Sequence, residues 1–296
     1  MRPRLLYIRG MNRLPTSLFI FLLIVSAVPL AMRSNSRRAP SQGTSPSFLG
    51  FDRNEYPGDD ALPILRKTFS FASYWIGPSP GEKRSTWLGK RPLLQSHGFG
   101  FVVLFSGRDS RSLRTVAAAH EKGAQDAQSA ANSAQQEGFP AGTVIFLDIE
   151  EGGRLPDTYH EYVRSWFDAL AAANYFGGAY CSAMQVREGG GASITTARDL
   201  QDHMGARKLI YWVYNDACPP SPGCSFSRAA LSPSGSGFAG ATVWQYAQSP
   251  RRKEFTAHCP ANYAPDGNCY APEDSAHKWF LDANVASSPD PSAAKK

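Results

Sequence analysis

Four acidic residues occur at or near the ends of apolar, β-rich segments, and their placement could support acid–base chemistry. They are Asp52, Asp148, Glu150 and Asp282. Asp148 and Glu150 close the segment 143–150, and the period of two along a strand points both side chains to one side while Ile149 faces the other. Two carboxyl groups on one side repel each other, so one pKa rises and that group can act as a general acid. Hydrolysis of a glycosidic bond uses such a pair, an acid for the leaving oxygen and a second carboxylate.

Other uses of strand-terminal acids stay open, because such residues also cap helices or form surface ion pairs. Glu151 continues the acidic run, and the strand alternation points it away from the pair, where we expect it to be solvated or paired. The six histidines contain no H-x-x-x-H pair, and the sequence has no G-x-S-x-G elbow, P-loop or dinucleotide fingerprint. We therefore expect no metal at the acids.

Aromatic residues accompany the same segment ends. Flat rings stack on the apolar faces of sugars, and their polar edges hydrogen-bond hydroxyl groups. Strand alternation assigns about half of these rings to the core. The residues that we predict to bind substrate are Tyr180, Trp212, Tyr214 and Gln245.

Eight β-rich runs with helical patterns between several of them must position these residues. Most of the runs are continuously apolar, as is typical of parallel strands covered on both faces. The segments 112–137 and 158–173 have helical patterns. Eight strands over about 240 residues favour an α/β fold, a (β/α)8 TIM-like barrel whose active site lies at the carboxyl ends of the strands. A doubly wound sheet is the alternative. The runs are 47–52, 69–76, 99–105, 143–150, 177–182, 209–214, 241–246 and 279–285.

The net charge of +6 originates in the N-terminal segment. Residues 1–48 hold seven arginines and no acidic residue, which leaves 24 basic against 25 acidic residues in the rest of the chain. The core is thus close to neutral, and its charge does not indicate nucleic-acid binding.

A basic start followed by the apolar run 18–25 predicts a signal peptide, or an uncleaved signal anchor, over 1–31. We expect an exported protein, whether periplasmic, secreted or attached to the cell envelope, which meets the membrane only if this segment is retained. Composition predicts a disordered linker over 32–47, one barrel domain over 48–286 and a disordered tail over 287–296. We expect the barrel to be a monomer.

Five cysteines fit a protein that forms disulfides outside the cytoplasm. Local bridges Cys218–Cys224 and Cys259–Cys269 are the simplest pairing, although four cysteines allow three connectivities. A zinc site is the weaker interpretation, because these loops contain no C-x-x-C pair. Cys181 lies in an apolar run and is expected to be a buried free thiol.

Five short motifs occur in order along the chain: GFD at 50–52, FLDIE at 146–150, GAY at 178–180, WQY at 244–246 and LDANV at 281–285. Together they resemble the glycoside-hydrolase-like barrel domain of secreted actinobacterial proteins grouped as a domain of unknown function. That domain is itself similar to the family 25 lysozymes (muramidases). The resemblance extends from residue 50 to about residue 286, which is nearly the whole predicted core.

The resemblance implies that Glu150 donates a proton while Asp148 assists it. It further implies that Asp52 and Asp282 are additional acids of the site and that Tyr180 and Gln245 line its mouth. The implied reaction is cleavage of the β-1,4 link between N-acetylmuramic acid and N-acetylglucosamine in peptidoglycan, without a cofactor.

The chain also departs from the lysozymes. The residues RNEYPGDD after GFD do not follow their first loop, and the segment 79–96 and the two cysteine loops look like insertions that would reshape the cleft. Three functions stay open: a peptidoglycan hydrolase, a non-catalytic module that binds cell-wall glycan on the same barrel, and a hydrolase of another polysaccharide.

Overall fold

The computed structural model describes residues 47–215, 231–247 and 281–295, all within one compact unit, residues 44–296. Several sequence predictions therefore lie outside the described residues. They are the signal segment 1–31, the linker 32–47 except its last residue, and the bridges proposed for Cys218, Cys224, Cys259 and Cys269.

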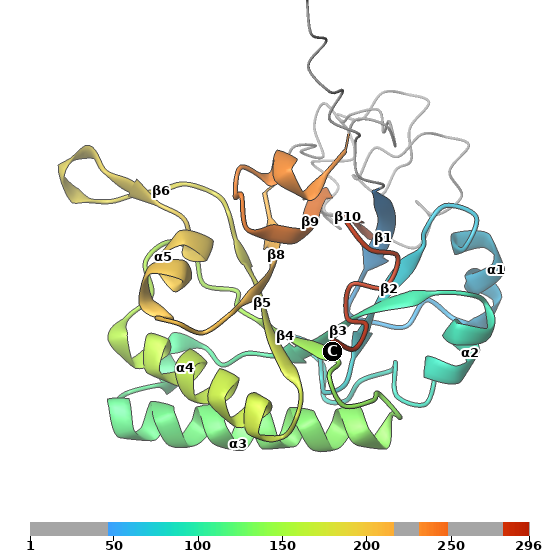
Figure 1. Ribbon diagram of the computed structural model, residues 1–296, viewed down its shortest axis with the longest axis horizontal. Helices are drawn as coiled ribbons and strands as arrows, with labels where there is room; N and C mark the ends of the chain where they lie inside the picture. The colour runs from blue at the N-terminus through green and yellow to red at the C-terminus, as the bar shows by residue number, and fades with distance from the viewer. Residues whose placement is uncertain (1–46, 216–230, 248–280, 296) are drawn as a thin grey trace, which may run out of the picture. The chain divides into compact units, whose positions relative to one another are not determined.

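Eight strands close into a barrel in the order β1-β10-β9-β8-β5-β4-β3-β2 (Figure 1). Each strand lies in one of the eight predicted runs or extends it by a single residue, so the predicted barrel is confirmed. The strands are β1 (Phe48–Asp52), β2 (Phe71–Trp75), β3 (Gly100–Ser106), β4 (Val144–Asp148), β5 (Phe176–Ser182), β8 (Ile210–Tyr214), β9 (Ala241–Ala247) and β10 (Asp282–Ala286).

The last strand departs from a regular (β/α)8 barrel because β10 is antiparallel to both of its neighbours, β1 and β9. Asp282 is the first residue of β10, and it pairs with Asp52, the last residue of β1. In a parallel strand the first residue would lie at the opposite end of the barrel. The reversed direction thus brings Asp282 to the end where the other acids lie.

Helices follow the strands of the first two-thirds of the barrel. The two predicted ones are present as α3 (Val116–Gln136) and α4 (Asp157–Ala172), which lie side by side in Figure 1. Their contact is close because α3 has glycine at position 123, where a Cβ would lie 2.3 Å from the carbonyl oxygen of Tyr162.

Short elements that the sequence analysis did not predict fill the connections. The α-helices are α1 (Leu62–Leu65), α2 (Arg91–Ser96) and α5 (Thr196–His203), and a two-stranded hairpin is formed by β6 (Val186–Arg187) and β7 (Ser193–Ile194). The 3-10 turns are η1 (Asp59–Ala61), η2 (Ser110–Ser112), η3 (Gly189–Gly191) and η4 (Pro233–Ser236). The hairpin joins β5 to α5 and projects from the barrel (Figure 1).

Among the described residues, no helix has the length and apolar content needed to cross a membrane.

Aromatic rings fill the barrel below the acids. Phe146 and Trp212 meet edge to face with their centroids 5.7 Å apart. Gly178 makes room for them, since a Cβ there would lie 2.4 Å from the Phe146 ring.

Cys181 is buried in β5 as a free thiol, as predicted, and burial raises its pKa well above the ordinary value.

The prediction of a disordered tail over 287–296 is wrong for the described residues 287–295. The backbone N–H of Phe101 donates to Asp290 Oδ1 at 2.9 Å, and that of Val103 donates to Ser292 Oγ at 2.8 Å. The N–H of Val144 donates to the carbonyl of Ser292 at 3.1 Å. Strands β3 and β4 pair only from Val103 onward, so their first residues leave backbone groups that the polar tail satisfies. The tail thereby closes the amino-terminal end of the barrel between β3 and β4.

Candidate functional site

The four predicted acids converge at the carboxyl end of the barrel. Burial raises the pKa of Tyr180 on β5 well above its ordinary value, and four carboxylates add to this by electrostatic repulsion of the phenolate. A side chain that responds to all four must lie near each of them. The four are Asp52, Glu150, Asp148 and Asp282.

Asp148 and Glu150 form a pair with very different exposure. Asp148, the last residue of β4, is only 3% exposed, whereas Glu150 is exposed on the loop beyond it. Burial raises the pKa of Asp148 well above its usual range, and repulsion by Glu150 and a hydrogen bond to Glu150 add to the increase. Burial and the neighbouring acid therefore both favour the protonated form of Asp148, which can donate a hydrogen bond to Glu150.

A cavity of about 490 Å³ opens beside this pair, and Asp148, Glu150 and Glu151 all line it. The backbone N–H of Ser110 donates to Glu151 Oε1 at 2.5 Å. The prediction that Glu151 is paired is therefore correct, while the prediction that it points away from the site is wrong. The chain leaves its strand geometry after Asp148, so strict alternation does not extend to position 151.

The opposite wall of the cavity is the loop after β3, residues 107–111. Gly107 approaches the end of β4 so closely that a Cβ would lie 2.2 Å from the Asp148 carbonyl, which accepts from the Gly107 N–H at 2.9 Å. Arg108 in this wall forms two hydrogen bonds to Asp126, at 2.6 and 2.7 Å. Its charge is thus compensated by the protein itself.

A chain of hydrogen bonds holds Asp52 below the pair. Its Oδ2 accepts from Asn284 Nδ2 at 2.6 Å and from Gln245 Nε2 at 2.9 Å. Asn284 Oδ1 accepts from the indole N–H of Trp212 at 2.8 Å, and Gln245 Oε1 accepts from the hydroxyl of Tyr180 at 2.8 Å. Strands β1, β5, β8, β9 and β10 are linked by this network, which fixes the floor of the site.

Burial raises the pKa of Asp52 to about 6, although the hydrogen bonds from Asn284 and Gln245 act in the opposite direction. Repulsion by Glu150 adds to the increase. Asp52 is therefore a second carboxyl group that holds a proton more tightly than a solvated aspartate does.

The predicted substrate-binding residues lie at different depths. Tyr214 is half-buried, and its ring centroid lies 5.5 Å from that of Tyr180. Trp212 and Gln245 are each 1% exposed and belong to the floor of the site. Tyr180 is 8% exposed and its hydroxyl belongs to the floor network, so Tyr214 is the one of these four residues that lies partly open to solvent.

Asn284 is a site residue that the sequence analysis did not identify. The signal was present in the motif LDANV, because Asp282 and Asn284 are two residues apart and share one face of a strand.

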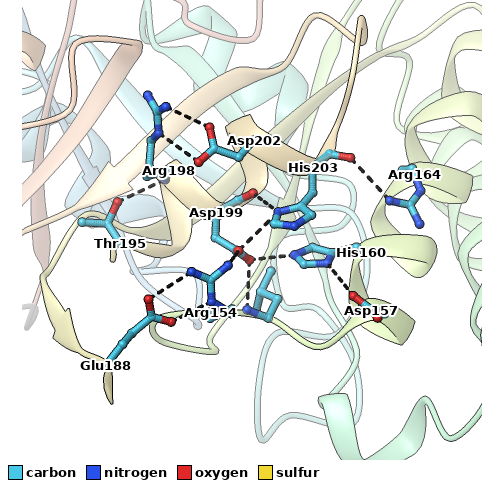
Figure 2. A network of polar contacts seen from close by, with 11 residues as sticks. Arg154, Asp157, His160, Arg164, Glu188, Thr195, Arg198, Asp199, Asp202 and His203 are labelled. Carbon is cyan, nitrogen blue, oxygen red and sulfur yellow. Dashed lines mark hydrogen bonds and ion pairs between the residues drawn. The ribbon is translucent and has the colours of Figure 1, made fainter. Parts of the chain in front are cut away.

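A second polar cluster, shown in Figure 2, lies where α4 and α5 meet. His160, Asp199 and His203 have the donor types of a metal site, with one ligand atom of each within 4.8 Å of the others. The two imidazole rings, however, are stacked, with centroids 3.9 Å and planes 10° apart. Since a nitrogen lone pair lies in its own ring plane, two stacked rings cannot both point at one ion. The guanidinium of Arg154, 3.4 Å from Asp199 Oδ1, also opposes a cation there, so this arrangement favours hydrogen bonding over metal binding.

Residues 92–218 match the family described as Rv2525c-like, glycoside hydrolase-like domain. This range contains Asp148, Glu150, Tyr180 and Tyr214, whereas Asp52 and Asp282 lie outside it. The resemblance to a glycoside-hydrolase-like barrel that the motifs indicate is thereby confirmed. No curated protein matches the chain.

Solved structures resemble the chain at low sequence identity. An uncharacterised protein of B. stearothermophilus is 16% identical with a TM-score of 0.51, covering 81% of this chain and 95% of its own. The Tat-secreted protein Rv2525c of Mycobacterium tuberculosis, in complex with L-tartrate, is 16% identical with a TM-score of 0.45 over the same shares of the two chains. The spore cortex lytic enzyme SleM of Clostridium perfringens is 13% identical with a TM-score of 0.46, covering 82% of this chain and 68% of its own.

Proposed function

We propose that this glycoside-hydrolase-like barrel is an exported hydrolase that cleaves glycosidic bonds of peptidoglycan or a related cell-envelope glycan. The observation that carries the proposal is the buried Asp148 hydrogen-bonded to the exposed Glu150 beside an open cavity, with the pKa of Asp148 raised by burial and by Glu150. The motif resemblance to the family 25 lysozymes supports peptidoglycan as substrate, and the N-terminal sequence supports export.

In the proposed reaction, Glu150 delivers a proton to the glycosidic oxygen, and Asp148 supplies that proton through the hydrogen bond between them. The bond from the anomeric carbon to this oxygen breaks, and its electron pair stays on the departing sugar. Burial favours the neutral form of Asp148, so this group holds a transferable proton more tightly than a solvated aspartate does.

Water then attacks the anomeric carbon, and its proton passes to a second carboxylate. Asp282 fits this role better than Asp52, because Asp282 is half-buried at the mouth. The Oδ2 of Asp52 already accepts two hydrogen bonds in the floor of the site. Tyr180 and Tyr214 would stack on or hydrogen-bond the sugar rings.

The test is release of reducing ends and soluble muropeptides from purified peptidoglycan, followed by mass spectrometry, with a panel of unrelated glycans beside it. We expect Glu150→Gln to abolish release while the protein stays folded. The matched control is Glu121→Gln, an exposed glutamate on α3 away from the mouth, which we expect to behave as the wild type. Equal turnover by Glu150→Gln would contradict the proposal. Retention of the wild type on peptidoglycan without any release would instead favour a non-catalytic binding module.

A further inference from the structure

Residues 149–156 connect β4 to α4. The six residues 150–155 of this connection carry both Glu150 and Glu151, and we call them the acid loop. The sheet holds the chain just before the loop, where the N–H of Ile149 donates to the carbonyl of Tyr180 at 2.9 Å. Beyond that point the loop has no strand partner, so other groups must set the position of the exposed Glu150.

Asp199 on α5 holds the far end of the acid loop. Its side chain is fully buried, and its Oδ2 accepts from the N–H of Leu155 at 2.9 Å. The same oxygen accepts from His160 Nε2 at 2.7 Å, and Arg154 Nη1 lies 3.4 Å from Oδ1. A buried carboxylate is tolerated only where donors compensate its lost hydration, and here two of the donors belong to the acid loop.

Two further contacts act on the middle of the loop. The hydroxyl of Thr196, at the start of α5, donates to the carbonyl of Glu151 at 3.1 Å. Arg154 forms two hydrogen bonds to Glu188 beside the hairpin, at 2.7 and 3.0 Å (Figure 2). The side chain of Val186 in β6 would lie 3.1 Å from a Cβ at Gly153, so the hairpin base packs directly on the loop.

The stacked histidines complete the enclosure of Asp199. His203 Nδ1 lies 2.7 Å from the backbone carbonyl of Asp199, and because a carbonyl only accepts, this nitrogen carries a proton. On the other edge of the His160 ring, Asp157 Oδ1 lies 3.8 Å from Nδ1. Figure 2 shows these groups converging on Asp199 from α4, α5 and the acid loop.

We infer that Asp199 is a positioning residue for the candidate catalytic pair, holding the acid loop so that Glu150 stays against Asp148. This inference rests on the proposed function for its effect on turnover, but its effect on the acid pair can be measured without substrate. An asparagine at 199 keeps the shape but loses one acceptor and the negative charge that faces Arg154 and His160. The loop then moves, Glu150 leaves Asp148, and the pKa of Asp148 falls toward its ordinary range.

The experiment compares the full chain with its Asp199→Asn and Asp202→Asn variants. Asp202 lies on the same helix but is exposed and pairs with Arg198, which makes it a matched control. The carboxyl carbon of Asp148 is titrated by NMR with ¹³C-labelled aspartate, and kcat and KM are measured on soluble peptidoglycan. We expect Asp199→Asn to lower the Asp148 titration midpoint and to reduce kcat about 10-fold or more while KM changes little. Asp202→Asn should match the wild type in both readings.

A second variant keeps the inference testable if Asp199→Asn does not fold. Glu188→Gln removes the charge of a half-buried residue that holds Arg154, and it should shift the Asp148 midpoint in the same direction by a smaller amount. A folded Asp199→Asn protein whose Asp148 titrates as in the wild type would overturn the inference. So would zinc that raises the melting temperature of the wild type but not of Asp199→Asn, since Asp199 would then be a metal ligand. A wild type without glycan turnover would count against the proposed function alone, because the titration still decides the role of Asp199.

Discussion

Two buried aspartates at neighbouring places in the fold have opposite surroundings. Burial raises the pKa of Asp148, and repulsion by Glu150, Asp52 and Glu151, all of them acidic, raises it further. Asp199 faces a backbone N–H, two imidazoles and a guanidinium. Burial alone therefore says little about what a carboxyl group does. Surrounding acids make Asp148 a proton reservoir, while surrounding donors make Asp199 an anchor.

The largest effect should come from Asp148→Asn, which removes the transferable proton yet can still donate a hydrogen bond to Glu150. We expect turnover of peptidoglycan to fall about 100-fold or more, the usual scale for loss of acid–base catalysis. Folding should be unaffected at neutral pH, because the amide keeps the shape of the side chain and, like the protonated carboxyl group, carries no charge. We would measure kcat/KM for turnover and urea unfolding for stability. A folded variant with the full turnover of the wild type would show that Asp148 has no part in the mechanism.

The same substitution at Asp199 should also lower stability, besides its effect on turnover. Asparagine can satisfy fewer of the donors around position 199, and we expect the free energy of unfolding to fall by about 2 kcal/mol. Asp202→Asn on the same helix should change it by less than about 0.5 kcal/mol, as is usual for an exposed ion pair. If chemical denaturation gave equal losses of unfolding free energy for Asp199→Asn and Asp202→Asn, Asp199 would contribute no more to stability than an exposed charge does.

The dependence of stability on pH sharpens the comparison. A carboxyl group whose pKa is higher in the folded protein than in the unfolded chain stabilises the fold at acidic pH, and this contribution is lost as the pH rises through the folded-state pKa. For Asp52 the pKa rises from an ordinary 3.8 to about 6. We therefore expect Asp52→Asn to gain stability relative to the wild type between pH 4 and about 6 and to level off above. A difference that does not change with pH, measured by thermal unfolding, would show that Asp52 titrates normally.

The smallest effect should come from the amino-terminal end of the barrel, far from either aspartate. Ser292→Ala removes the acceptor for the N–H of Val103 and should cost about 1 kcal/mol, because that donor is buried. Ser129→Ala, at an exposed position of α3, is the control. Turnover should be unchanged in both, so a loss of activity in Ser292→Ala would show that the two ends of the barrel are coupled.

Apolar runs in the sequence were sufficient to predict all eight strands and the barrel, because buried parallel strands leave uninterrupted apolar segments. Strand direction leaves no such pattern in the sequence, so the antiparallel direction of β10 was not predicted. The sequence analysis expected Asp282 at the mouth of a barrel of parallel strands, whereas the structure brings it there because β10 runs in the reversed direction. The four acids were found because the ends of strands meet in a barrel.

Contacts between distant segments were harder to predict. His160 belongs to α4 and Asp199 to α5, and nothing in their local sequence indicates that they meet. The spacing of four residues between Asp199 and His203 does predict that they share one face of a helix, and this was the part of the cluster that the sequence indicated. The polar composition of residues 287–296 suggested disorder, but whether such a segment is ordered depends on backbone groups of β3 and β4 that only the fold reveals.

The tail that closes the barrel between β3 and β4 has a consequence for the order of folding. Phe101 and Asp290 are 189 positions apart, and β1 also pairs with β10, so the ends of the domain are joined twice. A chain made from its amino end cannot complete the barrel until residues 290–292 have been synthesised. Contacts over such separations form slowly, so the barrel is expected to close as a late step of folding, after the strands and helices between these segments have formed.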